Sequence, residues 1–384
     1  MPSAPADVLT RARARVVAFG GPRLGPLIGS RGVDQGVLAV ASLLLAREAG
    51  PEAFAPLALL FVLNSLAVQV SDWGLGFAVL RTPPGRVLAV RSWHRLRALN
   101  VTVLAVALVA AVVMGGSNGW SVAAAGGIWA TSAEAYVRKS VALRDGRTRR
   151  VAVAEVVGTG VFAVAVVAMA VVGRYELLGP ALVLKHVVEL LVVGSPAHAF
   201  AVDGEPPRRL GESASQVLTY LVANVDYVVV SVLLTPVALS RYVIGFRMAS
   251  ALPALVANPL TQTSFVELGE AGPDQRPAVA ARQLRRALAL GAAGTVLVIV
   301  AAPVLPVLLG EEWEPVRGVM VLLALAVPWR LLVGLATAQA MTARAGTSFA
   351  RWEACRLVVM AVAAAVGARS GLFAASAAVT VATI

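Results

Sequence analysis

The chain has 384 residues, of which 58% are hydrophobic and 14% are charged, and its mean hydropathy is +0.79. A soluble domain is about half apolar and about a quarter charged, so this composition indicates a protein of the lipid bilayer. The single cysteine, Cys355, excludes a disulfide-stapled scaffold and a thiolate metal site. The net charge of +12 does not indicate a nucleic-acid partner, because a nucleic-acid-binding protein would not be this apolar.

Apolar runs long enough to cross a bilayer recur along the whole chain. A spanning helix needs about 20 predominantly apolar residues. Arg-rich, Gly/Pro-rich or acidic breaks separate these runs, and together they predict an all-α integral membrane protein with about twelve transmembrane helices. The predicted spans are 24–46, 53–79, 97–115, 119–142, 151–173, 177–195, 214–234, 241–262, 285–309, 317–341, 350–368 and 371–384.

Lysine and arginine alternate between the two sides of this arrangement. With the N-terminus inside, 23 basic residues fall in inside segments and five in outside segments. The inside residues lie within 11–23, 81–97, 138–150, 208–209, 276–286 and 344–351. Cytoplasmic loops carry the Lys/Arg excess. We therefore expect a multi-pass protein whose N-terminus is cytoplasmic.

The predicted outside loops are short. Residues 115–119 have the size of a turn, and the largest loop, 310–317, has only a handful of residues. A membrane glycosyltransferase, polymerase or ligase usually needs a larger external loop to hold its acceptor and catalytic groups. No metalloprotease, redox, P-loop or hydrolase motif occurs either. We therefore expect no enzyme activity and assign no catalytic or metal-binding residue.

The longest polar break inside the chain divides it into two halves. Residues 196–213 combine proline, glycine and charge, as expected for a cytoplasmic linker. The division predicts an N-terminal six-helix lobe over 1–195 and a C-terminal six-helix lobe over 214–384, whose last helix is short. Six spans per half would make the halves a parallel repeat. The faint similarity of 43–66 to 232–252 agrees with this.

Four ordered stretches carry a resemblance to a known family. They are LLLAREAGPEAFAPLAL (43–59), ALRDGRTRRVAVAEVVGTGV (142–161), NVDYVVVSVLLTPVALSRYVIGFRMASALP (224–253) and LGEEWEPVRGVMVLLALAVPWRLL (309–332). The ordered set resembles the lipid-linked oligosaccharide flippases of bacterial polysaccharide biosynthesis, within the multidrug/oligosaccharidyl-lipid/polysaccharide (MOP) transporter superfamily. Two departures are Ala55, where the pattern usually has glycine, and the last span, which stops at Ile384.

The resemblance implies a MOP/MATE-like fold with two six-helix lobes around a central cavity. It also implies a bacterial plasma-membrane protein that works by alternating access. Its substrate would be an undecaprenyl-pyrophosphate-linked oligosaccharide, moved from the inner to the outer leaflet. The expected partners are this lipid-linked glycan and membrane lipids, without nucleic acid, and other polysaccharide-assembly proteins are compatible with the resemblance.

Basic residues inside spans are the candidates for binding a pyrophosphate, because arginine stays charged and donates bidentate hydrogen bonds to phosphate. Arg247 and Arg330 have no close acidic neighbour in their own helix. Three further basic residues lie inside spans, and each has an acidic neighbour within four residues. The pairs are Arg31–Asp34, Lys185–Glu189 and Glu353–Arg356. We predict that Arg31, Arg247, Arg330 and Lys185 line the cavity. An internal ion pair is the alternative for each, and we favour it for Arg356.

Acidic residues inside spans are candidates for ion coupling. Asp226 lies near the centre of its span, and Asp34 lies in the first span. Each could bind a coupling H⁺ or Na⁺, or serve as a structural counter-ion. His186 fits a hydrogen-bonded histidine between helices better than a proton relay. We expect no cofactor other than a coupling ion.

Other functions remain open at this stage. A drug or metabolite antiporter of the same superfamily would favour a cavity with acids and few arginines. A membrane polymerase or ligase is disfavoured by the short outside loops. A third alternative is a non-transporting scaffold subunit, which the short last span would suit.

Overall fold

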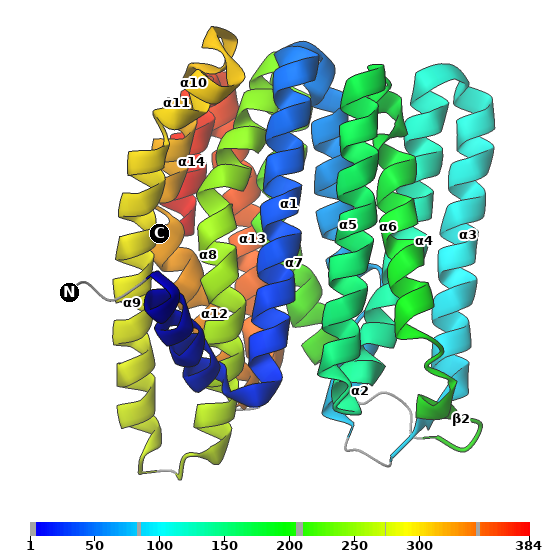
Figure 1. Cartoon of the computed structure of the whole chain (residues 1–384), viewed down its shortest axis with the longest axis vertical. Coiled ribbons are helices and arrows are strands. Elements are labelled where there is room, and N and C mark those ends of the chain that lie inside the picture. The colour runs from blue at the N-terminus through cyan, green and yellow to red at the C-terminus, as the bar shows by residue number, and fades with distance from the viewer. Residues whose placement is uncertain (1–4, 83–85, 205–209, 273, 343–345) are drawn as a thin grey trace.

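The structure, a computed structural model, describes residues 5–82, 86–204, 210–272, 274–342 and 346–384. Long helices stand side by side with short connections (Figure 1). The helices are α1 (Pro5–Val70), α2 (Leu75–Arg81), α3 (Val90–Met114), α4 (Gly116–Arg144), α5 (Thr148–Val172), α6 (Leu178–Val193), α7 (Leu210–Leu233), α8 (Pro236–Glu270), α9 (Arg276–Ala301), α10 (Val304–Leu309), α11 (Pro315–Ala324), α12 (Val327–Thr342), α13 (Gly346–Arg369) and α14 (Leu372–Thr383). The predicted all-α fold is confirmed.

Short elements complete the chain. Three 3₁₀ turns, η1 (Tyr175–Leu177), η2 (Ala197–Ala199) and η3 (Glu311–Trp313), lie between helices. Strands β1 (Leu88–Ala89) and β2 (Phe200–Ala201) pair in parallel. The predicted linker 196–213 therefore begins with η2 and β2, whereas its last residues already belong to α7; residues 205–209 lie outside the described part.

The first two predicted spans form a hairpin within α1. Residues 29–68 are one apolar stretch of 40 residues, and a straight helix of that length would measure about 60 Å, about twice the hydrocarbon core of a bilayer. Gly50 interrupts it with a φ of 72°, which glycine adopts without steric penalty. The chain folds back there, as the long α1 ribbon shows (Figure 1).

The predicted span 53–79 is interrupted near its end. The Asp72 carboxylate accepts hydrogen bonds from the backbone N–H groups of Gly74, at 3.1 Å, and Gly76, at 2.7 Å. These bonds stabilise the turn over 71–74 and the start of α2. Asp72 is thus a capping residue.

Prolines break or bend two further predicted spans. Pro303 separates α9 from α10, and Pro328 lies where the segment η3–α11 meets α12 at an angle of 44°. Pro328 has no N–H to donate to the Ala324 carbonyl one turn earlier. The Thr295 hydroxyl donates to that carbonyl instead, at 2.9 Å, so the polar group freed by the bend is satisfied.

By length and hydropathy alone, four helical stretches of the described chain could cross a membrane, or five if the bent pair counts as one span. They are Gly29–Val68, Val90–Met114, Thr148–Val172 and Arg276–Ala301. Two of them bury little of their surface: 11% of the apolar window in α3 and 17% in α9 is buried within the protein. An outward surface this apolar suits lipid rather than water, as in a multi-pass membrane protein.

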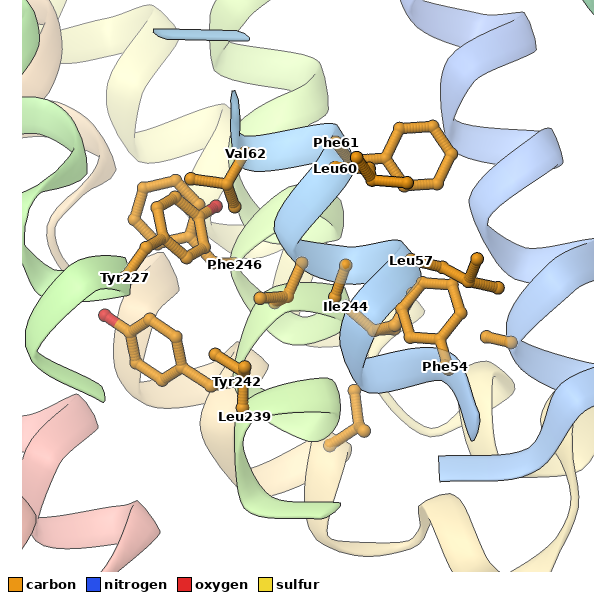
Figure 2. Packing of buried hydrophobic residues seen from close by; sticks show 14 of the residues in the cluster. Phe54, Leu57, Leu60, Phe61, Val62, Tyr227, Leu239, Tyr242, Ile244 and Phe246 are labelled. Atoms are coloured by element: carbon orange, nitrogen blue, oxygen red, sulfur yellow. The ribbon is translucent and has the colours of Figure 1, made fainter. Parts of the chain in front are cut away.

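The helices form two groups. We call α1–α6 the N-terminal group and α7–α14 the C-terminal group. The second half of α1 packs along α8 and joins them. Figure 2 shows this seam, where Val62 of α1 lies beside Phe246 of α8 and Tyr227 of α7 in one buried cluster. The site described below lies on this seam.

The two ends of the bundle differ in charge. The α4–α5 and α8–α9 turns lie at the same end as β2 (Figure 1). Arginines occur densely there, within 144–150 and 276–286, and we call it the basic end. The hairpin of α1 and the short α10 lie at the opposite end, which we call the Gly50 end (Figure 1).

Candidate functional site

A cavity of about 140 Å³ lies on the seam between the two groups. The α1 hairpin forms one wall, and α7 and α8 form the other. Its lining combines amides, hydroxyls and aromatic rings with one charged side chain, that of Arg247. The residues are Gln35, Ala39, Phe61, Val62, Ser65, Asn224, Tyr227, Val243, Phe246, Arg247, Ser250 and Ala251.

Arg247 presents a cation to the cavity and makes no ion pair with a described residue, although Asp34 interacts with it electrostatically beyond ion-pair distance. Its guanidinium lies 4.4 Å from the centroid of the Phe61 ring, across the seam. It makes no ion pair or hydrogen bond with any residue that the structure describes. A ring face attracts a cation but leaves the N–H groups at the edge of the guanidinium unused. These N–H groups remain available to an anion.

Arg330 lies directly behind the same wall. Its Nη1 donates to the Ser250 hydroxyl at 2.7 Å, and its guanidinium lies 4.3 Å from the centroid of the Phe246 ring. Both contacts are residues of the cavity lining. The structure therefore brings Arg247 and Arg330 together around one cavity. Neither has an acidic ion-pair partner within the described chain, as their helix neighbours suggested.

Asp226 lies in the same wall, within α7. Its side chain is buried, and its Oδ2 accepts a hydrogen bond of 2.6 Å from the Tyr242 hydroxyl. Its Oδ1 is buried without a hydrogen-bond partner. A buried polar atom without a partner is costly, so this oxygen is suited to a proton or a cation.

Arg31 lies one helical turn from the cavity-lining Gln35. The neighbouring Asp34, which its spacing suggested as a partner, points elsewhere. Asp34 Oδ1 lies 2.9 Å from the ammonium nitrogen of Lys185 in α6. Arg31 itself makes no ion pair within the part of the chain that is described.

Lys185 is part of a buried ion network and not of the cavity lining. Besides Asp34, it contacts Glu189 Oε1 at 3.2 Å, which confirms the pair at spacing i, i+4. Lys139 of α4 extends the network, because its Nζ lies 3.0 Å from Glu189 Oε2 and 3.7 Å from Glu155 Oε1. Two lysines and three carboxylates thus form one connected ion network inside the N-terminal group.

Neutral groups add hydrogen bonds to this network. The Thr159 hydroxyl donates to Asp34 at 2.6 Å, and the Ser30 hydroxyl donates to Glu155 at 2.7 Å. His186 Nε2 lies 2.8 Å from the side-chain oxygen of Asn64, and its Nδ1 lies 3.4 Å from Glu189 Oε2. His186 is therefore hydrogen-bonded between helices, as expected. The Glu353–Arg356 pair is also confirmed, at 2.9 Å.

Sequence reasoning missed Lys139 as a member of the network. It lies among the arginines of 138–150, which the charge distribution assigned to an inside loop. The spacing of residues along α4 does not indicate that Lys139 has a partner in α6. Only the close approach of α5 to α6 explains the cluster: a Cβ on Gly158 would lie 2.8 Å from the Cγ of Glu189 and 3.0 Å from the Lys185 carbonyl.

The two groups are also joined at the Gly50 end. The Ser240 hydroxyl donates to the Pro51 carbonyl at 2.5 Å, and the Arg47 guanidinium donates to the Leu308 carbonyl at 3.1 Å. The rings of Phe54 and Trp313 pack edge to face with centroids 6.0 Å apart. The cavity is thus closed off from this end by contacts between α1 and the C-terminal group.

Comparisons with known proteins concern the fold. The sequence matches no protein-family model and no curated protein. Several solved structures share its architecture. An inward-facing multidrug resistance MATE family transporter of the MOP superfamily has a TM-score of 0.62 and 16% identity, and the match covers 91% of each chain.

Two further structures have other described roles. The lipid II flippase MurJ, in an inward closed conformation, has a TM-score of 0.65 and 10% identity, over 93% of this chain and 85% of that one. A MOP superfamily transporter from Pyrococcus furiosus, for which a reversed polarity of the binding pocket suggests a different function, has a TM-score of 0.62 and 15% identity, over 96% and 94%. The chain therefore has the all-α membrane fold of the MOP transporters.

Proposed function

We propose that this chain moves an undecaprenyl-pyrophosphate-linked oligosaccharide from the inner to the outer leaflet of a bacterial plasma membrane. The observation that carries the proposal is the unpaired guanidinium of Arg247 in a cavity between two helix groups. An ionised side chain inside a membrane protein is costly and marks a functional site by default. A cation without a counter-ion suits an anionic ligand.

The pyrophosphate would bind to arginine. A guanidinium offers a planar set of donors that matches phosphate oxygens and stays charged at every physiological pH. Arg247 supplies it at the cavity surface, and Arg330 supplies a second positive charge from behind Ser250 and Phe246. Arg31 would add a third. Lys185 contributes through its ion network, by fixing α1 against α6.

The rest of the lining suits an uncharged sugar. The side-chain amides of Gln35 and Asn224 and the hydroxyl of Ser65 can donate to and accept from sugar hydroxyls. The rings of Phe61 and Tyr227 offer apolar faces to a pyranose. The isoprenoid tail would stay in lipid, because only the headgroup requires a polar path.

Translocation would proceed by alternating access between the groups. With the basic end in the cytoplasm, the contacts at the Gly50 end keep the cavity closed toward the outside. Separating these contacts while the basic end closes would release the headgroup in the outer leaflet. Asp226 and Asp34 are the acids that would bind a coupling H⁺ or Na⁺, and the unpartnered Oδ1 favours Asp226.

A drug or metabolite antiporter is the second candidate. The shared fold with a multidrug resistance transporter supports it. So does the cluster of three buried carboxylates in the N-terminal group, because acids suit cationic drugs and coupling ions. That cluster already holds two lysines, whereas the cavity holds an unpaired arginine, so we favour the anionic substrate. The described relatives are transporters and flippases, which weighs against a membrane polymerase or ligase.

Transport in proteoliposomes tests the proposal. Wild-type protein should move a fluorescent undecaprenyl-pyrophosphate oligosaccharide between leaflets, as measured by its protection from a membrane-impermeant quencher. Arg247→Ala and Arg330→Ala should each reduce the rate at least about tenfold, since each removes a charged hydrogen-bonding group. Arg369→Ala, at an exposed arginine outside the cavity, should keep it. Wild-type rates in both cavity variants, or transport of cationic dyes alone, would contradict the proposal.

A further inference from the structure

One helical turn beyond the cavity, toward the basic end, both walls carry polar side chains. Arg31 precedes the lining residue Gln35 by four residues in α1, and Tyr220 precedes the lining residue Asn224 by four residues in α7. Both helices run from the basic end toward the Gly50 end (Figure 1). Residues four apart lie on the same helix face. Arg31 and Tyr220 therefore continue the cavity surface toward the basic end.

A third helix adds a tyrosine at this level. Tyr136 of α4 interacts electrostatically with both Arg31 and Tyr220, and Arg31 and Tyr220 interact with each other. The Tyr136 ring fits against Gly76, where any Cβ would lie 2.5 Å from its Cε1. The glycine thus leaves the space that the ring occupies. Arg31, Tyr136 and Tyr220, from α1, α4 and α7, form a cluster that we call the Arg31 station.

The donors of the Arg31 station are unused. In the described part of the chain, neither tyrosine hydroxyl donates a hydrogen bond, and the Arg31 guanidinium makes no ion pair. All three side chains are partly exposed, so a ligand can reach them. The acid that also interacts with both tyrosines, Asp72, is buried and already accepts two backbone hydrogen bonds. It therefore does not occupy the guanidinium.

The chemistry of these donors selects an anion. One guanidinium and two phenolic hydroxyls, contributed by three helices, can all donate hydrogen bonds, and phosphate oxygens accept from both N–H and O–H groups. Among the described residues, no carboxylate forms an ion pair with Arg31, whereas Glu189 and Asp34 both pair with Lys185.

We propose that the Arg31 station is a second anion-binding site, which holds a phosphate group of the substrate on its way between the basic end and the Arg247 cavity. The inference rests on the proposed function and adds two residues to it, Tyr136 and Tyr220. The step between the two sites is about one helical turn, about 5–6 Å. A diphosphate can therefore pass from one site to the other without losing all of its cationic contacts.

Both helix groups contribute side chains to the Arg31 station. Arg31 and Tyr136 belong to the N-terminal group, whereas Tyr220 belongs to the C-terminal group. A phosphate bound at the Arg31 station would bridge α1 and α7. The bridge forms only while the groups are close at this level, so occupancy of the station depends on the conformation of the transporter.

Binding of farnesyl pyrophosphate to the full chain in phosphatidylcholine nanodiscs tests the inference. Arg31→Gln should weaken binding about tenfold, and Tyr136→Phe and Tyr220→Phe should each weaken it severalfold, since each hydroxyl donates to a charged acceptor. Tyr175→Phe, a matched change in η1 far from the station, should have no effect. Removing a hydroxyl leaves the ring packing intact, and an unchanged melting temperature checks that these variants fold.

The outcomes separate the inference from the proposed function. If Arg247→Ala weakens binding while Arg31→Gln and both tyrosine variants bind as wild type, the cavity proposal stands and the Arg31 station is overturned. If Arg247→Ala also binds as wild type, the cavity proposal fails as well. A second arm uses inorganic pyrophosphate. Equal affinity for it and for farnesyl pyrophosphate would identify a site for free phosphate and would overturn the assignment to a lipid-linked substrate.

Discussion

The Arg247 guanidinium of α8 lies over the Phe61 ring of α1, 4.4 Å from its centroid. This contact joins the two helix groups at the cavity and orients a cation that makes no ion pair or hydrogen bond within the described chain. The ring holds the guanidinium by its face, and the donors at its edge stay free for an anion. Phe61 is thus a positioning residue for Arg247.

Phe61→Leu should therefore weaken binding of farnesyl pyrophosphate severalfold, because a cation–π contact away from water is worth about 2 kcal/mol and leucine does not replace it. Phe61→Tyr keeps an aromatic face and should bind within about twofold of wild type. Titration of both variants in nanodiscs measures this. Equal weakening in the two variants would show that the volume of the side chain matters rather than its ring.

The Asp34–Lys185 pair should contribute to stability. Lys185→Met should destabilise the chain by about 3–5 kcal/mol, because it leaves three carboxylates with a single lysine in this network. Asp34→Asn should cost less, because it leaves two carboxylates with two lysines. The double variant should lose less than the sum of the two. Thermal unfolding in detergent, followed by loss of the monodisperse elution peak, gives the comparison. Strict additivity would mean that the two side chains do not interact.

Glycine positions in α5 offer a matched pair. Gly158→Ala should destabilise the chain by about 1–3 kcal/mol, since its methyl group would crowd Glu189 and the Lys185 carbonyl. Gly160 has no atom within 4 Å of an added Cβ and is exposed. Gly160→Ala should be neutral or stabilising by up to about 1 kcal/mol, through helix propensity. The same melting assay ranks both, and the reverse order would refute the close approach of α5 to α6.

The contacts at the Gly50 end should limit access to Ser240. This residue is fully buried and bonded to Pro51, and its neighbour Arg241 donates to the Glu312 carbonyl at 2.6 Å and 3.0 Å. In a Cys355→Ser background, a cysteine introduced by Ser240→Cys should react slowly with a membrane-impermeant maleimide. Adding Arg241→Ala should raise the rate severalfold. Fast labelling without that second change would show that this end is already open.

The contact between Asp145 and His198 should respond to acid. His198 Nε2 donates to Asp145 at 2.6 Å, at the basic end and outside the spans. Burial alone would raise the pKa of Asp145, but the hydrogen bonds from His198 and Arg144 outweigh burial and lower the pKa below its usual 3.8. The stabilisation is therefore complete above pH 3.8 and is lost as the pH falls through the lowered pKa.

Asp145→Asn should accordingly lower the melting temperature at pH 7 and at pH 5 by the same amount. The difference from wild type should shrink only below pH 3.8. Melting curves over this range give the test, with Asp203→Asn, an exposed acid of the same end, as the control. A difference that already disappears between pH 7 and pH 5 would contradict the prediction, because the Asp145 carboxylate stays ionised over that range.

Hydropathy, together with the polar and Gly/Pro-rich breaks between apolar runs, predicted most of the helices, because lipid-facing helices must be apolar over their whole length. The predicted span 350–368 lies within α13, and the predicted span 151–173 ends one residue beyond α5. Interruptions such as the turn at Asp72 were not predicted, since a cap is a local hydrogen bond that hydropathy averages out.

Some ion-pair partners of the charged residues were predicted from the sequence, and others were not. Pairs within one helix, such as Lys185–Glu189, follow from spacing and were predicted. Asp34 shows the limit: spacing favoured Arg31, but the facing helix α6 brings Lys185 to it. Tyr136 and Tyr220 carried no signal at all, because an uncharged side chain inside a span becomes informative only when its neighbours in other helices are known.

The Asp34–Lys185 pair also affects how the chain is made. Asp34 is synthesised with the first hairpin, whereas Lys185 arrives with α6, after α2, α3, α4 and α5. The hairpin therefore enters the membrane with a carboxylate whose counter-ion does not yet exist, and it cannot settle in lipid at low cost until α6 follows. Membrane insertion of the N-terminal group is consequently completed by its last helix, and a nascent chain released before α6 would be a substrate for membrane quality control.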